Sequence, residues 1–167
     1  TIEQMDVDLV NYKKDRHKLE YVDYFKTFLE CKNPPPLKYL FVDEAQDLSV
    51  HQWMVVDMIQ QVSKPVETYV AGDDDQAIFR WAGADIEHFI AMANDDANTI
   101  IPLTQSYRVP KSVHNLATKM AQSITNRIEK SYKPRDEEGE RKVLAFRPLN
   151  KSLAEGEWLI LCRTHEI

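Results

Sequence analysis

The pattern of hydrophobic and polar positions predicts four helices. Aromatic and aliphatic side chains recur at helical spacing in residues 19–30. A second helix follows Ser49, which forms the residue pair of a capping box with Gln52. Asp85 is placed to cap a third, short helix. A fourth begins near Pro110, since proline suits a first helical turn.

Short apolar runs between these helices predict strands. Residues 39–42 show no alternation, which is typical of a parallel strand covered on both faces. Residues 67–71 and 100–103 form two further candidates, and residues 143–146 and 158–162 add two more near the end of the chain. Strands that alternate with helices predict an α/β protein in which helices flank a parallel sheet.

Composition narrows the class of protein. The chain has 167 residues, of which 43% are hydrophobic and 29% charged, so it can form one domain or parts of two. No apolar run approaches the roughly 18–20 residues that cross a bilayer, and the start at Thr1 shows no signal peptide. Cys31 and Cys162 form no metal or redox motif, and we expect two buried thiols in a cytoplasmic protein without a membrane partner.

Glycine positions exclude two phosphate-binding loops. The four glycines have no spacing of five, and none precedes a lysine: Gly72, Gly83, Gly139 and Gly156. The loop G-x-x-x-x-G-K-[ST] is therefore absent from these 167 residues, and the same positions exclude the G-x-G-x-x-G dinucleotide loop.

Charge is divided unevenly along the chain. Residues 43–98 hold twelve acids and two bases, a balance of 2 − 12 = −10, whereas residues 105–142 hold nine bases and five acids, a balance of 9 − 5 = +4. An acidic block beside a basic block is typical of a junction between two lobes. Two solvated surfaces without a partner remain the alternative on charge alone.

Two predicted strands end in carboxylate clusters, namely Asp43 with Glu44 and the triplet at residues 73–75. Ligands of open α/β sheets bind beyond the carboxyl ends of the strands, and Mg²⁺ prefers carboxylate and water oxygens, so a cation site is a candidate here. The alternative is that these acids cap helices and turns. Because like charges crowd together, we expect some of these carboxyls to have raised pKa values or to recruit a cation.

Several segments, in order, resemble the UvrD/Rep-type superfamily-one DNA helicases. Residues 39–47, YLFVDEAQD, resemble the Walker B segment of that family, and residues 70–84, VAGDDDQAIFRWAGA, resemble its next motif. Residues 103–108, LTQSYR, resemble the motif that opens the second RecA-like domain. Looser matches cover residues 19–23, LEYVD, and residues 160–165, ILCRTH.

The resemblance implies an α/β fold of the RecA-like, P-loop NTPase type: an incomplete parallel sheet with flanking helices, followed by the beginning of a second RecA-like domain. We place the end of the first domain at residues 1–98 and the start of the second at residues 99–167. The phosphate loop is then expected before Thr1, which makes the chain a central fragment that holds half of an ATP site.

The resemblance also implies roles in the hydrolysis of Mg-ATP. Asp43 matches the carboxylate that holds Mg²⁺, and Glu44 matches the general base beside that metal. Gln76 matches the sensor of the γ-phosphate, Arg108 an arginine finger, and Tyr107 the ring that stacks on adenine. A surface salt bridge for Arg108 and a half-buried ring for Tyr107 are the structural alternatives.

A contact with single-stranded DNA is implied for Phe79, Arg80 and Trp81. Bases stack on aromatic rings without sequence preference, and Trp81 matches the stacking tryptophan of the family. Ala82 stands where the family usually has arginine, which puts one DNA contact in doubt. The alternative for Trp81 is an ordinary core residue.

The resemblance favours part of an ATP-dependent DNA helicase or single-stranded DNA translocase. Its expected partners are ATP, Mg²⁺, single-stranded DNA and the remainder of the parent chain, and the 167 residues alone are expected to be inactive. A metal-dependent nuclease that uses the clustered acids is the alternative enzyme, and a helicase-derived module without catalysis is the other alternative.

Overall fold

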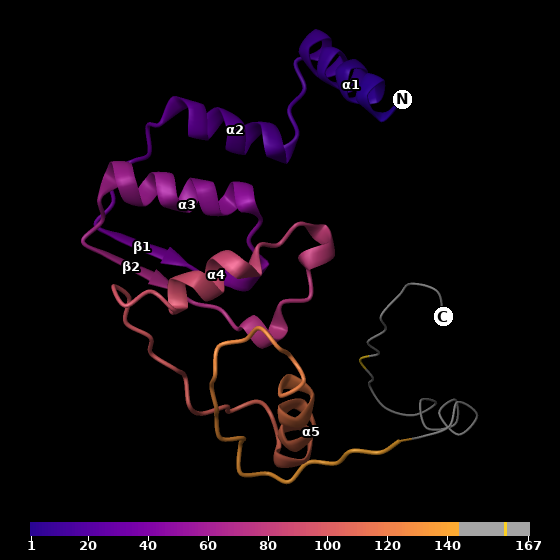
Figure 1. Ribbon diagram of the computed structural model, residues 1–167, viewed down its shortest axis with the longest axis vertical. Helices are drawn as coiled ribbons and strands as arrows, with labels where there is room; N and C mark the ends of the chain where they lie inside the picture. The colour runs from indigo at the N-terminus through magenta and orange to yellow at the C-terminus, as the bar shows by residue number, and fades with distance from the viewer. Residues whose placement is uncertain (144–158, 160–167) are drawn as a thin grey trace. The chain divides into compact units, whose positions relative to one another are not determined.

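The computed structural model describes residues 1–143 and residue 159 (Figure 1). Its elements are, in chain order, α1 (Ile2–Arg16), α2 (Tyr21–Cys31), β1 (Tyr39–Val42), η1 (Ala45–Asp47), α3 (Val50–Ser63), β2 (Glu67–Val70), η2 (Asp74–Gln76), η3 (Arg80–Ala82), α4 (Ile86–Ala93) and α5 (Lys111–Ala121). The chain forms two compact units. Residues 1–102 and 124–130 make the first, and residues 103–123 with the described residues from 131 onward make the second.

The four predicted helices are confirmed, two of them with the predicted caps. Ser49 is the N-cap of α3. Its hydroxyl accepts a hydrogen bond from the amide of Gln52 at 3.4 Å, and its own amide donates to the Gln52 side chain at 2.8 Å. Asp85 caps α4, and Pro110 is the residue before α5. The sequence did not predict α1, because this helix has no apolar stripe and buries no residue.

The strands β1 and β2 lie parallel, with Tyr39 opposite Glu67 and Val42 opposite Val70. Alternate residues of both strands are exposed; on the open face the rings of Phe41 and Tyr69 stack with centroids 5.0 Å apart. The expectation that β1 is covered on both faces is therefore wrong for the described residues. Because side chains alternate between faces, only one face can contact the helices packed against it.

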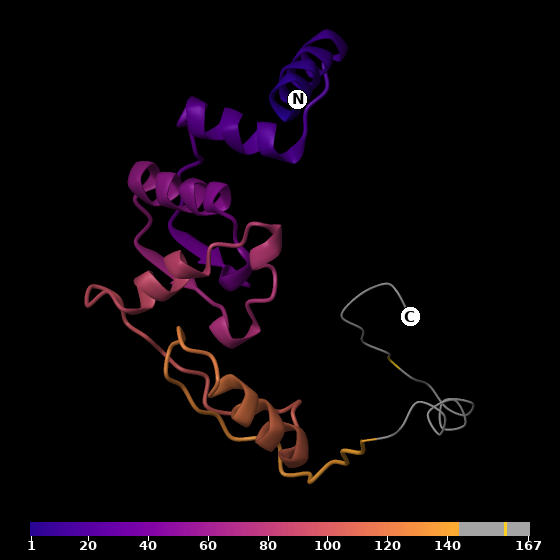
Figure 2. The ribbon, with the colours of Figure 1, turned by 45° about the vertical axis from the view of Figure 1, so that its right-hand side comes forward.

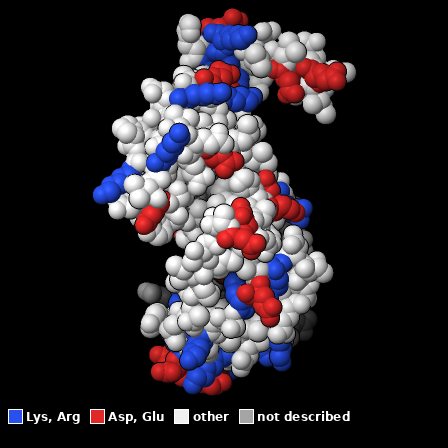
Figure 3. Space-filling view, turned by 60° about the vertical axis from the view of Figure 1, so that its left-hand side comes forward, with Lys and Arg blue, Asp and Glu red and all other residues white. Residues whose placement is uncertain are grey.

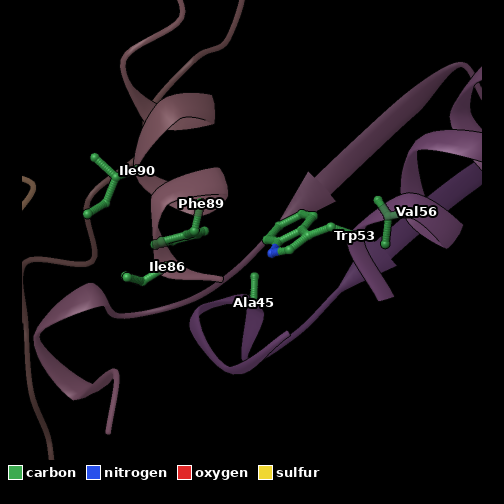
Figure 4. Packing of buried hydrophobic residues seen from close by; sticks show 6 residues of the cluster. All are labelled: Ala45, Trp53, Val56, Ile86, Phe89 and Ile90. Carbon is green, nitrogen blue, oxygen red and sulfur yellow. The ribbon is translucent and has the colours of Figure 1, made fainter. Parts of the chain in front are cut away.

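The core of the first unit forms around Trp53, which is 1% exposed and whose indole N–H donates to the carbonyl of Asp85 at 3.2 Å. Figure 4 shows Trp53 between Val56 and the residues of α4, with Ala45 beside the indole. The buried cluster consists of Ala45, Trp53, Val56, Ile86, Phe89 and Ile90. Inward residues of both strands and Ile128 pack against it, so the core holds α3, α4 and the sheet together. Figure 2 shows α2 alongside α3 on the first unit.

Residues 100–103 are not a strand, so that prediction is wrong. Ile100, Ile101 and Leu103 are all exposed, and Pro102 supplies no amide for a ladder. The strand predicted at 143–146 lies outside the described residues except for Val143, which is exposed and in no strand; that at 158–162 lies outside except for residue 159.

The remaining expectations concern the burial of the two cysteines, membrane-spanning helices and the domain boundary. Cys31 is exposed at the end of α2, so the expectation of a buried thiol is wrong for this residue, and Cys162 lies outside the described residues. Within the described part of the chain, no helix combines the length and the hydropathy required to cross a membrane. The domain boundary between residues 98 and 99 stays a prediction.

Candidate active site

The carboxylates after β1 and those after β2 meet at one edge of the sheet. Because the two strands are parallel neighbours, their carboxyl ends lie side by side. Backbone bonds extend this pairing past both strands: the amide of Ala71 donates to Val42 at 2.8 Å, and the amide of Ala45 donates to Ala71 at 3.0 Å. The segments 43–47 and 71–76 are thus fixed against each other by the sheet itself.

Asp43 and Glu44 are both exposed at this edge. The amide of Glu44 donates to Oδ1 of Asp43 at 2.9 Å, which leaves the second carboxylate oxygen of Asp43 without a protein partner among the described residues. Glu44 has φ of 50° in the left-handed region, where residues other than glycine are uncommon. Such a conformation persists only where its surroundings hold it, and it is frequent at functional sites.

Gln46 links the two strand ends, a role that the sequence did not assign. Its side chain is 2% exposed; Nε2 donates to Oε2 of Glu44 at 2.8 Å, and Oε1 accepts the amide of Asp73 at 3.0 Å. The signal available in the sequence was its place inside the segment DEAQD, but no hydrophobic pattern indicates the burial of an amide.

Gln76 lies exposed in the turn after β2 and continues this chain of contacts. Its Nε2 donates to Oδ2 of Asp73 at 2.6 Å, while Oδ1 of Asp73 accepts the amide of Asp75 at 3.2 Å. A continuous set of hydrogen bonds therefore runs from Glu44 through Gln46 and Asp73 to Gln76.

The aspartates at 73–75 are paired with two cations of the segment 124–130, which belongs to the same compact unit. Nε and Nη2 of Arg127 donate to the two oxygens of Asp75 at 2.8 and 2.6 Å. Lys130 contacts Asp74 and lies 3.2 Å from both Asp73 and Asp75. Asp74 is 7% exposed and also accepts the amide of residue 128 at 2.7 Å.

For Asp75, these ion pairs contradict the expectation that a carboxyl of the clusters has a raised pKa. The hydrogen bonds from Arg127, with a further contribution from Lys130, lower the pKa of Asp75. Burial alone would lower the pKa of Lys130, but its bonds to the three aspartates raise it above the usual value. The protein supplies its own cations here, so the like charges do not face one another unpaired.

The acidic and basic blocks of the sequence meet at this cluster, because Asp73, Asp74 and Asp75 belong to the first and Arg127 and Lys130 to the second. The remaining charges are mixed: on the face drawn in Figure 3, acidic and basic side chains are interspersed among wide uncharged areas. This face presents no continuous basic stripe among the described residues.

Phe79, Arg80 and Trp81 lie in and beside the turn η3, between β2 and α4. The Trp81 side chain is 84% exposed and that of Phe79 44%, so the interpretation of Trp81 as a core residue is wrong. Arg80 donates to Glu87 at 2.6 Å on the surface. Gly83 ends the turn at φ of 96°, a conformation that favours glycine.

Tyr107 and Arg108 belong to the second compact unit, and both are exposed. The amides of Arg108 and Val109 donate to the hydroxyl of Ser106 at 3.3 and 3.1 Å, which shapes the turn that presents them. The Tyr107 ring is 86% exposed, which excludes the half-buried alternative. Arg108 makes no ion pair within the part of the chain that the structure describes, and its role stays a prediction.

Of the two carboxylate clusters, the one at residues 43–44 fits a bound cation and the one at residues 73–75 does not. Asp43 and Glu44 are exposed oxygen donors, which suits Mg²⁺ held by one or two carboxylates, waters and phosphate oxygens. The aspartates at 73–75 are occupied by Arg127 and Lys130 and do not fit as ligands. No group of three or more His, Cys, Asp or Glu among the described residues is arranged to hold a metal by itself.

The fold and the site thus define a mixed α/β protein with exposed carboxylates at the joined ends of two parallel strands. Comparison with known proteins gives its family. Residues 16–97 match the UvrD/REP helicase N-terminal domain. The chain is 32% identical over 123 residues to the ATP-dependent DNA helicase PcrA of Bacillus subtilis, and 35% identical over 106 residues to that of Staphylococcus aureus.

A probable DNA helicase II homolog of Rickettsia felis is 32% identical over 121 residues. These alignments cover 73%, 62% and 68% of this chain but only 16%, 14% and 18% of the relatives. The chain belongs to the UvrD/Rep-type superfamily-one helicase family, as its motifs indicated. It spans about one sixth of the length of these relatives.

Proposed function

We propose that this chain forms part of an ATP-dependent DNA helicase or single-stranded DNA translocase. Membership of the UvrD/Rep-type family supports the proposal, as does similarity to proteins named ATP-dependent DNA helicase PcrA. The observation that carries it is the hydrogen-bonded link between the strand ends, which joins the candidate base Glu44 to the candidate sensor Gln76.

Asp43 and Glu44 contribute the chemistry of hydrolysis. In the proposed complex, the exposed carboxylate of Asp43 holds Mg²⁺, and Glu44 accepts a proton from the attacking water. Bound Mg²⁺ neutralises charge on the β- and γ-phosphates. Glu44 is suited to its role because its carboxylate is exposed and one of its oxygens is fixed by Gln46, which leaves the other for water.

The remaining site residues complete a nucleotide site in this proposal. Gln76 orients water and senses the γ-phosphate through its exposed amide. Arg108 supplies a cation to the transferring phosphoryl group, and Tyr107 stacks on adenine. Exposure of both side chains supports these roles, since a group that binds ligand must be accessible.

The turn that carries Phe79 and Trp81 is the proposed contact with single-stranded DNA. Trp81 follows Gln76 by five positions in the same connection between β2 and α4, so one short segment holds both the sensor and the stacking ring. The exposed ring of Trp81 is suited to stacking on bases. Arg80 is already paired with Glu87, so DNA must compete with this ion pair for its guanidinium.

Two observations favour the helicase proposal over the nuclease and over the module without catalysis. A nuclease that uses both carboxylate clusters for two metals requires free aspartates at 73–75, whereas Arg127 and Lys130 occupy them. A module without catalysis would not need the link from Glu44 to Gln76. The helicase assignment therefore uses more of what the structure contains.

The test is ATP hydrolysis by the complete polypeptide that carries this sequence, measured with and without single-stranded DNA. We expect Mg²⁺-dependent hydrolysis that DNA stimulates, lost in Asp43→Asn and retained in Asp96→Asn, an exposed acid outside the site. Mg²⁺-dependent cleavage of DNA without ATP would support the nuclease instead, and an absence of both activities would support the module.

A further inference from the structure

Gln46 is a buried polar side chain in which both the amide nitrogen and the amide oxygen form hydrogen bonds. With 2% of its surface exposed, its amide is enclosed between the end of β1 and the end of β2. A buried amide without partners is strongly destabilising, and here both ends are satisfied at 2.8 and 3.0 Å.

The chemistry of the partners fixes the orientation of this amide. The backbone N–H of Asp73 can only donate, so it selects Oε1 of Gln46, and the carboxylate of Glu44 accepts, so it selects Nε2. A glutamate at this position would accept from Asp73 but repel Glu44, and a methionine would do neither. The amide of Gln46 joins the two groups with both bonds.

Packing holds the side chain in place. A Cβ added at Gly72 would lie 2.8 Å from Oε1 of Gln46 and 3.0 Å from the ring of Phe89, so no space remains on that side. Ala45, the preceding residue, is completely buried. Gln46 is therefore a rigid donor, whereas the Glu44 side chain that it contacts is exposed and flexible by nature.

We infer that Gln46 is a positioning residue for ATP hydrolysis, because it holds the carboxylate of Glu44. The inference rests on the proposed function, because it acts through Glu44 as general base. A base that is held in its productive geometry works far better than one that samples several rotamers, and a misplacement of about 1 Å can lower a rate roughly 10²-fold.

The experiment measures ATP hydrolysis by the complete polypeptide at saturating single-stranded DNA. Gln46→Met removes both hydrogen bonds, whereas Gln46→Glu keeps the acceptor for Asp73 and places a like charge beside Glu44. We expect kcat per folded molecule to fall about 10- to 100-fold in both variants, with KM for ATP unchanged within about threefold. Folded protein is counted by the stoichiometry of binding of a non-hydrolysable ATP analogue.

Gln52→Met is the matched control, because Gln52 closes the capping box of α3 and touches neither strand end. This control is expected to lower the thermal midpoint while leaving kcat per folded molecule unchanged. If the Gln46 variants behave in the same way, Gln46 is merely structural and the inference is wrong.

A double-mutant cycle with Glu44→Gln separates the inference from the proposed function. If Gln46 acts through Glu44, Gln46→Met adds no further loss in the Glu44→Gln background. Losses that multiply would overturn the inference. If Glu44→Gln alone abolishes hydrolysis but Gln46→Met does not slow it, the inference fails and the proposed function stands; normal hydrolysis by Glu44→Gln would reject the proposed function itself.

Discussion

At the residue scale, an exposed tryptophan is the feature most in need of an explanation. Burial of an indole stabilises a fold strongly, and Trp53 shows this in the core, yet Trp81 leaves 84% of its surface in solvent. The turn η3 fixes its backbone without using its ring, which is therefore available for a ligand. The proposed ligand is a base of single-stranded DNA.

Trp81→Ala is expected to weaken the affinity of the complete polypeptide for single-stranded DNA by about 1–3 kcal/mol, the value of one stacked base. DNA-stimulated hydrolysis falls with it, whereas hydrolysis without DNA is retained. Stability changes by no more than about 0.5 kcal/mol, because the ring packs against little. Fluorescence anisotropy with a labelled oligonucleotide measures the affinity.

Tyr12→Ala is the control for a general loss of aromatic surface, because it removes an exposed ring that lies on α1, outside the proposed DNA contact. Equal affinities of Trp81→Ala and the wild type would show that Trp81 is not the stacking residue.

Individual site residues were predictable to different degrees. The motifs marked Asp43, Glu44, Gln76 and Trp81, and the structure shows them exposed at or near the ends of the strands. Gln46 could not be predicted as a bridge, because its role depends on the register of β1 against β2 rather than on its neighbours in the sequence.

At the scale of elements, the segment 124–130 contacts the turn after β2 through a cluster of three carboxylates and two cations. Two cations and one backbone amide satisfy the three aspartates, although 52 or more positions separate the partners. Ile128 adds an apolar contact to the core. The segment therefore fastens the turn that carries Gln76.

Asp75→Asn is expected to lower the free energy of unfolding at pH 7 by about 1–3 kcal/mol, since it leaves Arg127 without its bidentate carboxylate. Because the folded pKa of Asp75 is lowered, its stabilising contribution is present above the ordinary carboxyl pKa of about 3.9 and is lost as the pH falls through the folded value. The difference between variant and wild type should therefore begin to shrink below about pH 4 and disappear only below the lowered folded pKa of Asp75.

Urea unfolding of the 167-residue chain at several pH values measures this difference, with Asp96→Asn as the control for a surface charge. A difference that is the same at neutral and acidic pH, or absent at neutral pH, would contradict the role assigned to the ion pair.

Helices and strands were predictable from the sequence where the residues that determine them lie close together in the chain. The capping box at Ser49 and the cap at Asp85 lie within one turn of the helices that they begin, so the sequence alone indicated both. The prediction of a strand at residues 100–103 was wrong because an apolar run becomes a strand only when a neighbouring strand pairs with it. The pairing of Arg127 with Asp75 was unpredictable, since charge patterns do not reveal which distant residues meet.

At the scale of the whole molecule, these 167 residues hold the carboxylates of the proposed nucleotide site but no glycine-rich phosphate loop. Backbone amides and the lysine of such a loop supply much of the contact with the phosphates in P-loop enzymes. The site described here is thus one half of what the proposed activity requires.

The 167-residue chain alone is therefore expected to show no tight binding of Mg·ATP analogue in a calorimetric titration. The carboxylates of Asp43 and Glu44 repel the triphosphate when no cradle of amides and lysine offsets them. Binding in the micromolar range would show that another phosphate cradle exists within these residues, and the half-site interpretation would be wrong.

The most direct test of the proposed function is the rate of ATP hydrolysis by the complete polypeptide with Glu44→Gln. The amide keeps the shape and the neighbours of Glu44 but cannot accept a proton from water. We expect ATP binding to persist while kcat falls about 10²- to 10⁴-fold, the usual contribution of a general base. Turnover close to that of the wild type would contradict the proposed function.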